Sequence, residues 1–345
     1  MSLVWREAVD LSAANTLRLP CRARVLAVAR NEADVREAFV RAAAAGLDVH
    51  VLGGGSNVVL PARLEGVALC LEPVAPPAFA AGEVELPGGC DWDAAVRASA
   101  SAGLWGMENL ALIPGRVGAA PVQNIGAYGR ELADVCVSVR AVDSRTGEVV
   151  EFSADDCGFA YRDSRFRRAP GRWMITAVTL RLAEAGSPLL DYPSLREACA
   201  GMRPTTPLEM VEHVSALRRA RLPDPAQHPN AGSFFKNPVL PAEAWAALQQ
   251  RAPDCPGRAE GAGTKVPAAW LIERAGWRGR RSGSFAVAEA HALVLVHEGG
   301  GDGAGLLAFA AEITADVEQR FGVRLEREPV LLGWNEVPAG ADTSS

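Results

Sequence analysis

The first part of the chain carries the pattern that most constrains its fold: an expected strand, helix and second strand that run directly into three consecutive glycines. Residues 22–29 alternate and are rich in β-forming residues, which predicts a strand. Asn31 is a suitable N-cap, acidic residues follow it in the first turn, and Gly46 is a typical helix end. Residues 49–52 predict a second short strand, so we expect a β-α-β unit.

The loop after this unit has the composition of an anion site, and its residues are Gly53, Gly54, Gly55, Ser56 and Asn57. Consecutive glycines allow positive φ angles and let successive backbone N–H groups converge on a pyrophosphate. The side chains of Ser56 and Asn57 add hydrogen-bond donors. No G-x-G-x-x-G sequence opens a helix here and no G-K-[ST] ending is present, which excludes a Rossmann fingerprint and a Walker A loop. A plain tight turn after an edge strand is the alternative.

The bulk properties narrow the classes of protein to consider. A chain of 345 residues suggests two or three domains, and a net charge of −6 gives no basic surface for nucleic acid or an anionic membrane. No signal-peptide pattern opens the chain, and no apolar run reaches the roughly 18 residues of a transmembrane helix. The seven cysteines form no C-x-x-C pair and, with five dispersed histidines, offer no metal-ligand spacing. We expect a cytoplasmic protein with reduced thiols and no metal.

A long Gly-rich segment, residues 104–130, has almost no periodicity. Long loops of this kind are often functional. Its centre, residues 113–129, is dense in glycine and alanine, which allows the backbone to approach a flat or phosphorylated ligand, and Gln123 and Asn124 can supply directional hydrogen bonds. A purely structural loop is the alternative.

Residues 230–238 place a hydroxyl, a cation and two amides around two adjacent phenylalanines. A half-buried polar pocket would explain this mixture. The alternative is a turn that its phenylalanines anchor to the core, with Lys236 in water.

Two charged segments are further candidates. Residues 161–164 set an arginine between a tyrosine and an aspartate, as expected for a guanidinium held against a carboxylate or oxyanion, and residues 326–329 read Glu-Arg-Glu-Pro. Solvated charged faces are the alternative for both.

Other elements follow from periodicity and capping signals. The pattern predicts helices near 206–221, 242–250, 268–275 and 304–321, and closing strands near Val323 and 330–332. Three prolines between 223 and 229 mark a plausible domain boundary.

In chain order, the segments 53–60, 113–129, 161–164, 230–238 and 325–328 make the sequence similar to the UDP-N-acetylenolpyruvoylglucosamine reductase family. Asp191 and Tyr192 resemble the subclass with an additional loop that carries a substrate-contacting tyrosine. The resemblance implies an α+β fold with a two-part FAD-binding module of the vanillyl-alcohol-oxidase (PCMH) type and a third α+β domain for substrate. The implied division is 1–72 with 322–345 and 73–220 for FAD, and 221–321 for substrate.

The resemblance also implies the site residues. The implied FAD-binding residues, with FAD held non-covalently, are Gly53, Gly54, Gly55, Ser56, Asn57, Ile113, Pro114, Gly115, Gly118, Ala119, Gln123, Gly126, Ala127 and Tyr128. The implied catalytic residues are Arg162, Ser233 and Glu328, and the implied substrate-binding residues are Tyr161, Tyr192, Arg221, Asn237 and His291. Arg221 stands where relatives often have lysine, and His291 stands where some have glutamine.

By resemblance, the chain is a monomeric enzyme of peptidoglycan synthesis. NADPH would reduce FAD, and hydride would then pass to C3 of the enolpyruvyl group of UDP-N-acetylglucosamine enolpyruvate. Ser233 would protonate C2, while Arg162 and Glu328 polarise the carboxylate.

Two alternatives stay open. A related flavin oxidase is disfavoured because residues 53–60 and 113–129 contain no histidine or cysteine for covalent flavin attachment. A non-catalytic UDP-sugar binder is the other.

Overall fold

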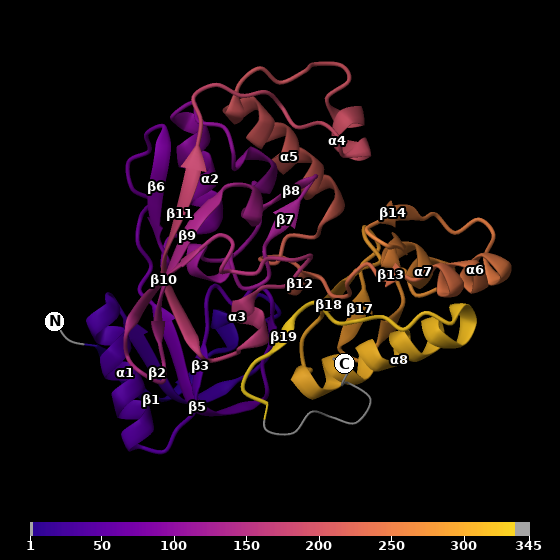
Figure 1. The fold of residues 1–345 in the computed structure, drawn as a ribbon. Coiled ribbons are helices and arrows are strands. Elements are labelled where there is room, and N and C mark those ends of the chain that lie inside the picture. The colour runs from indigo at the N-terminus through magenta and orange to yellow at the C-terminus, as the bar shows by residue number, and fades with distance from the viewer. Residues whose placement is uncertain (1–2, 335–345) are drawn as a thin grey trace. The chain divides into compact units, whose positions relative to one another are not determined.

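The structure, a computed structural model, describes residues 3–334. By internal contacts the chain divides into two compact units, whose elements are labelled in Figure 1. Among the described residues, unit 1 comprises 3–9, 23–54 and 65–219, and unit 2 comprises 10–22, 55–64 and 220–334. The glycine loop at 53–57 therefore carries the chain from one unit into the other. The three-part division implied by the family resemblance stays a prediction.

One sheet, which lies mainly in unit 1, confirms the β-α-β opening. In spatial order its strands are β1 (Val4–Asp10), β2 (Arg22–Ala29), β5 (Arg63–Leu71) and β3 (Val49–Val51). β3 runs parallel to β5, with Val49 opposite Val67. Helix α1 (Glu32–Ala44) connects β2 to β3, and the Asn31 side chain accepts a 2.9 Å hydrogen bond from the Asp34 N–H as its cap. The buried residues of α1 recur at helical spacing and pack against β2 and β5.

A second sheet of unit 1 is antiparallel throughout. In spatial order its strands are β10 (Val149–Ser153), β9 (Cys136–Asp143), β11 (Trp173–Leu182) and β6 (Gly82–Pro87). Helices α2 (Trp92–Ser101) and α5 (Pro207–Arg221) contribute to the same apolar core. Trp92 is buried there, and its Nε1–H donates to the Leu110 carbonyl oxygen at 3.1 Å. Shorter elements are β7 (Gly126–Ala127), β8 (Arg130–Glu131), α3 (Arg165–Arg168) and α4 (Pro193–Ala198).

Unit 2 combines small sheets with helices. One sheet has the order β12 (Asn230–Ser233), β18 (Val294–His297), β17 (Phe285–Val287) and β16 (Arg281–Ser282). Another has the order β13 (Val239–Leu240), β15 (Gly263–Lys265) and β14 (Arg258–Glu260), and β19 (Val330–Leu331) pairs in parallel with β4 (Val58–Val59). Helices α6 (Ala242–Arg251), α7 (Ala268–Arg274) and α8 (Gly303–Phe321) share an apolar core with Phe234 and Phe235.

Two sequence-based expectations differ from the structure. No strand forms near Val323, because that segment leaves α8 as a loop whose buried Val323 and Leu325 anchor it to the core rather than to a ladder. The segment 104–130 is less irregular than expected, since it contains 3-10 turns at Glu108–Leu110 and Val117–Ala119 and the β7–β8 hairpin. Short turns of this kind leave no periodic hydrophobic signal in a sequence.

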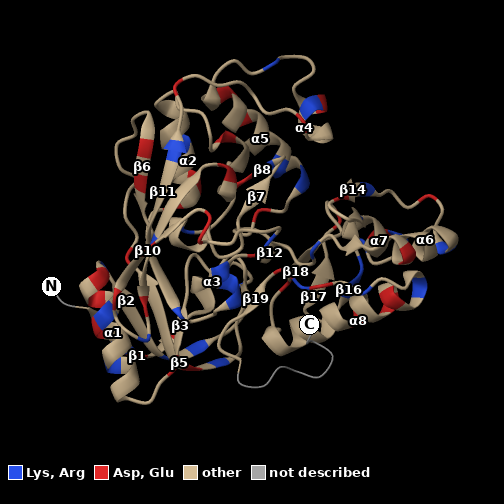
Figure 2. Ribbon diagram, viewed as in Figure 1, with Lys and Arg blue, Asp and Glu red and all other residues tan. Residues whose placement is uncertain are grey.

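Basic and acidic residues both occur along the ribbon of α1, coloured blue and red in Figure 2. Arg30 pairs with Asp34 at the start of α1, and Arg320 pairs with Asp316 on α8, both at i,i+4 spacing. Within residues 3–334, every helix is too short or too polar to cross a membrane.

Candidate active site

Gly53 and Gly54, the part of the first glycine loop that belongs to unit 1, lie directly against the 113–129 loop. A Cβ atom on Gly54 would come 2.8 Å from the Cα of Gly115, and one on Gly53 would come 3.0 Å from the Cβ of Ala119. Since these contacts leave no room for larger side chains, the backbone of the 53–57 loop reaches the 113–129 loop itself. A surface built from peptide groups suits a phosphate ligand. The structure therefore brings together two of the segments that the sequence assigned to FAD.

Arg162 lies on a tight turn that holds its backbone at φ +53°. For a residue other than glycine this conformation costs about 1–2 kcal/mol. Its Nη2 donates a 2.7 Å hydrogen bond to the Gly126 carbonyl oxygen, and its guanidinium carbon lies 5.3 Å from the centre of the Tyr161 ring. These contacts hold the guanidinium against the 113–129 loop. Strained backbone of this kind is common at functional sites.

Asn124 has a structural role rather than the ligand-binding role that the sequence suggested. Its side chain is buried, and its Nδ2 donates to Glu131 Oε2 at 2.8 Å and to the Ala160 carbonyl oxygen at 3.2 Å. Its Oδ1 accepts a backbone N–H at 3.0 Å. Nearby, the Ser164 hydroxyl donates to the Val122 carbonyl oxygen at 2.7 Å. Together these bonds fix the turn that carries Arg162 to the 113–129 loop.

Tyr128 joins the loop to the additional tyrosine-bearing segment. Its ring meets the Tyr192 ring edge-on, with centroids 5.4 Å apart and planes at 83°. Asn109, which the sequence did not single out, donates to the carbonyl oxygens of Tyr128 (2.9 Å) and Leu189 (3.1 Å) and so holds both segments. Tyr192 itself is 42% exposed.

Arg218, on α5, is a candidate that sequence reasoning missed. Its Nε is buried and has no hydrogen-bond partner within residues 3–334. Burial lowers the pKa of its guanidinium, interactions with Tyr128 and Asp93 raise that pKa, and Arg162 lowers it. Arginine stays charged in proteins, so this Nε–H remains available to donate to an acceptor of a bound ligand.

Ser233 and Glu328 lie on adjacent segments of unit 2. The Glu328 N–H donates to the Phe234 carbonyl oxygen at 2.9 Å, and the Lys236 N–H donates to the Glu326 carbonyl oxygen at the same distance. Both phenylalanines of the 230–238 segment are buried, while Lys236 Nζ lies 3.2 Å from Glu326 Oε2. The turn is therefore anchored to the core by its phenylalanines, and Lys236 pairs with the 326–329 segment.

Two predicted substrate-binding residues of unit 2, Asn237 and His291, accept backbone hydrogen bonds within the fold. Asn237 Oδ1 accepts the Ala268 N–H at the start of α7, 2.9 Å away. His291 Nδ1 accepts the Leu293 N–H at 3.2 Å. Burial lowers the pKa of His291, Arg221 and Arg278 lower it further, and Glu273 opposes them.

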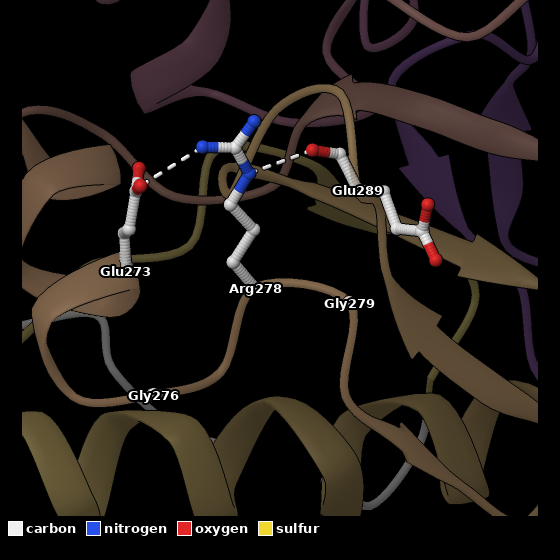
Figure 3. A pocket seen from close by; sticks show the side chains of 5 residues that line it. All are labelled: Glu273, Gly276, Arg278, Gly279 and Glu289. Atoms are coloured by element: carbon white, nitrogen blue, oxygen red, sulfur yellow. Dashed lines mark hydrogen bonds and ion pairs between the residues drawn. The ribbon is translucent and has the colours of Figure 1, made fainter.

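Figure 3 shows an open pocket of unit 2, which is about 610 Å³ and lined by Glu273, Gly276, Arg278, Gly279 and Glu289. Arg278 Nη1 contacts Glu273 Oε1 at 2.8 Å, and Arg278 Nε donates to the Glu289 carbonyl oxygen at 2.7 Å. Arg278 is thus a second cation near His291 that the sequence did not indicate.

The predicted site residues fall into two groups. Arg162, Tyr161, Tyr192 and the 113–129 loop belong to unit 1, whereas Ser233 and Glu328 belong to unit 2. The meeting of the three catalytic residues therefore stays a prediction. Within residues 3–334, no three His, Cys, Asp or Glu side chains gather in a way that could hold a metal ion.

Residues 23–153 match the family model of an FAD-binding domain, which places the chain in the class of FAD-binding oxidoreductases. Residues 224–332 match the C-terminal domain of UDP-N-acetylenolpyruvoylglucosamine reductase. The chain is 45% identical to that reductase from Pseudomonas aeruginosa over 338 residues, covering 96% of this chain and 100% of the relative. It is 47% identical to the Burkholderia pseudomallei reductase over 334 residues, covering 94% and 96%. The chain belongs to the UDP-N-acetylenolpyruvoylglucosamine reductase family.

A solved structure gives the same fold. The reductase from Thermus caldophilus superimposes with a TM-score of 0.65 at 23% identity and covers 96% of this chain and 99% of its own. This match confirms the α+β fold, while the relatives and the family models confirm the family resemblance and the FAD-binding module. The described residues also fit FAD, because the contact between Gly54 and Gly115 offers a backbone cradle and the buried Nε of Arg218 remains available to donate to an acceptor of a bound ligand.

Proposed function

We propose that this chain is an NADPH-dependent UDP-N-acetylmuramate dehydrogenase, which reduces UDP-N-acetylglucosamine enolpyruvate to UDP-N-acetylmuramate for peptidoglycan synthesis. It would act as a monomer in the cytoplasm. The similarity to named reductases over nearly the whole chain supports this activity. The observation that carries the proposal is the hydrogen bond that sets the Glu328 segment beside the Ser233 segment.

The cofactor-binding residues of the proposal are those predicted from the sequence, with Arg218 added. When bound there, FAD supplies a two-electron carrier that takes hydride from NADPH and gives it to C3 of the enolpyruvyl group. The backbone of Gly53 and Gly54 and of the 113–129 loop would face its phosphates, since their close contact excludes side chains. Arg218 would donate from its buried Nε to an acceptor of the ligand.

The protein's own residues would handle charge and protons on the substrate. Addition of hydride at C3 leaves negative charge at C2 and on the neighbouring carboxylate. Arg162 would stabilise this charge, and Glu328 would assist as a protonated acid. Ser233 would give its hydroxyl proton to C2, and a proton from solvent would restore it. Tyr161, Tyr192, Arg221, Asn237 and His291 would bind the substrate, with Tyr192, Arg221 and Asn237 near its uridine diphosphate.

A two-stage anaerobic experiment tests the proposal. NADPH should bleach the flavin band near 450 nm, and UDP-N-acetylglucosamine enolpyruvate should then restore it with formation of UDP-N-acetylmuramate. NADH in the first stage would measure the preference for NADPH. A colourless, folded preparation would support the non-catalytic binder. Rapid reoxidation by air, with an alcohol or phenol as reductant, would support the oxidase.

A further inference from the structure

Asn230, the first residue of β12, is buried and uses its whole side chain in hydrogen bonds within unit 2. Its Oδ1 accepts the Gly232 N–H at 2.8 Å, and its Nδ2 donates to the carbonyl oxygens of Pro223 (3.1 Å) and His228 (2.6 Å). Its backbone N–H donates to the Thr16 carbonyl oxygen at 3.1 Å. If the amide were flipped, its NH₂ group would face the Gly232 N–H, and its oxygen would face the carbonyl oxygens of Pro223 and His228. The side chain is therefore fixed in one orientation.

This side chain closes a bulge in β12. Asn230 pairs with Val296 and Ser233 pairs with Val294, so three steps along β12 match two along β18. Gly232, inside the bulge, has φ +71°. A bulge re-aims the side chains that follow it, and a strand without the extra residue would turn Ser233 to the opposite face. The bond from the Gly232 N–H to Asn230 Oδ1 thus helps to decide where the Ser233 hydroxyl points.

The chain is held on both sides of Ser233. Asn230 fixes the residues before it, and the Glu328 N–H holds the carbonyl of Phe234 directly after it at 2.9 Å. We infer that Asn230 is a positioning residue that aims the hydroxyl of Ser233 at the carbon it protonates; this rests on the proposed role of Ser233. Asn230 acts through the bulge and needs no contact with substrate. A displacement of about 1 Å at a reacting group can cost about 10²-fold in rate.

The test uses the FAD-loaded enzyme and two kinds of variant. Asn230→Ala removes all three side-chain bonds, whereas Asn230→Ser keeps a short oxygen that can accept the Gly232 N–H. Gly232→Ala disturbs the bulge without a clash, since no atom lies within 4 Å of the added Cβ. Gly261→Ala is its matched control, because Gly261 has φ +56° and equally open space but lies outside β12 and its sheet.

We expect Asn230→Ala and Gly232→Ala to slow the return of flavin colour at saturating enolpyruvyl substrate by about 10- to 100-fold. Asn230→Ser should recover part of that rate. NADPH-driven bleaching and substrate affinity, measured by calorimetry, should change less than about threefold in all of these variants. Gly261→Ala should match the wild type in both stages. Equal losses in both stages, or no loss in the second, would overturn the inference.

A double-mutant cycle separates positioning from general damage. If Asn230 acts through Ser233, Asn230→Ala should add little to the defect of Ser233→Ala. Additive defects would overturn the inference even though the single variants are slow. Failure of the proposed function itself looks different, because the wild-type enzyme would then show no return of colour with the enolpyruvyl substrate.

Discussion

The backbone N–H of Glu328 lies 2.9 Å from the carbonyl oxygen of Phe234, the residue that directly follows Ser233. The two residues are about 95 positions apart in the sequence, yet this bond sets their segments side by side. It gives the proposed proton donor and the proposed carboxyl group a common support within one compact unit. The proposed roles of Ser233 and Glu328 at the substrate can therefore be tested one residue at a time.

Glu328→Gln tests the carboxyl group. The amide is nearly isosteric and leaves the backbone bond to Phe234 in place, so folding should be preserved. Loss of the acid should slow the return of flavin colour with the enolpyruvyl substrate by about 10²-fold or more. Stopped-flow absorbance near 450 nm measures both stages. A loss confined to bleaching by NADPH would contradict the assigned role.

Ser233→Ala tests the proton donor. Removal of the hydroxyl should leave NADPH-driven bleaching intact and slow the second stage by about 10²- to 10⁴-fold, the usual range for general acid catalysis. Ser233→Cys, which retains a transferable proton, should recover part of the rate. If both stages of Ser233→Ala match the wild type, another group delivers the proton.

Gly54→Ala tests the contact between the two glycine loops. A methyl group at this position would lie 2.8 Å from the Cα of Gly115, and backbone cannot move aside as a flexible side chain can. We expect purified Gly54→Ala to hold less FAD than the wild type, measured as the ratio of absorbance at 450 nm to that at 280 nm. Gly201→Ala is the matched control, since no atom lies within 4 Å of its added Cβ. Full FAD content in Gly54→Ala would show that the two loops can move apart without loss of FAD binding.

The sequence predicted the motifs because each is a local pattern. The Asn31 cap, the glycine loops and the Phe-Phe turn depend on residues a few positions apart, and the structure contains all of them. Arg218 could not be recognised in this way. It is one of several arginines near the end of α5, and only tertiary packing buries its Nε while leaving Arg219 exposed.

The bulge at Asn230 was equally hidden from sequence reasoning. A bulge exists only relative to a partner strand, and β18 lies more than 60 residues further along the chain. Asn124 shows the opposite error, because its polar side chain in a Gly-rich loop suggested a ligand contact although its bonds are internal. Burial, which the sequence does not report, decides between these two roles.

Arg218→Met tests the buried Nε of Arg218, which has no hydrogen-bond partner within residues 3–334. Methionine fills similar space without a buried donor, so the apoprotein should keep or raise its thermal unfolding midpoint. FAD affinity, measured by titration of the apoprotein, should fall about 10- to 100-fold, the equivalent of one hydrogen bond from a charged donor at about 1.5–3 kcal/mol. Arg219→Met, at the adjacent exposed position, should change neither quantity. Unchanged FAD affinity with a lower unfolding midpoint would make Arg218 purely structural.

His291→Gln tests how the stability of the protein depends on pH through the imidazole of His291. Burial lowers the pKa of His291 from 6.5, and Arg221 and Arg278 lower it further, so the folded protein resists protonation at this position. In the unfolded chain the imidazole titrates near pH 6.5. As pH falls below about 6.5, the unfolded state therefore binds more protons than the folded state, and stability falls until the lowered pKa is passed. Protonation would also break the hydrogen bond in which His291 Nδ1 accepts the Leu293 N–H.

Glutamine has no such titration, so the fall in unfolding midpoint from pH 7 to pH 5.5 should be smaller in His291→Gln than in the wild type. The exposed His228, replaced by glutamine, provides the control. Identical pH profiles for wild type and His291→Gln would show that this imidazole is not the group that limits stability in mild acid.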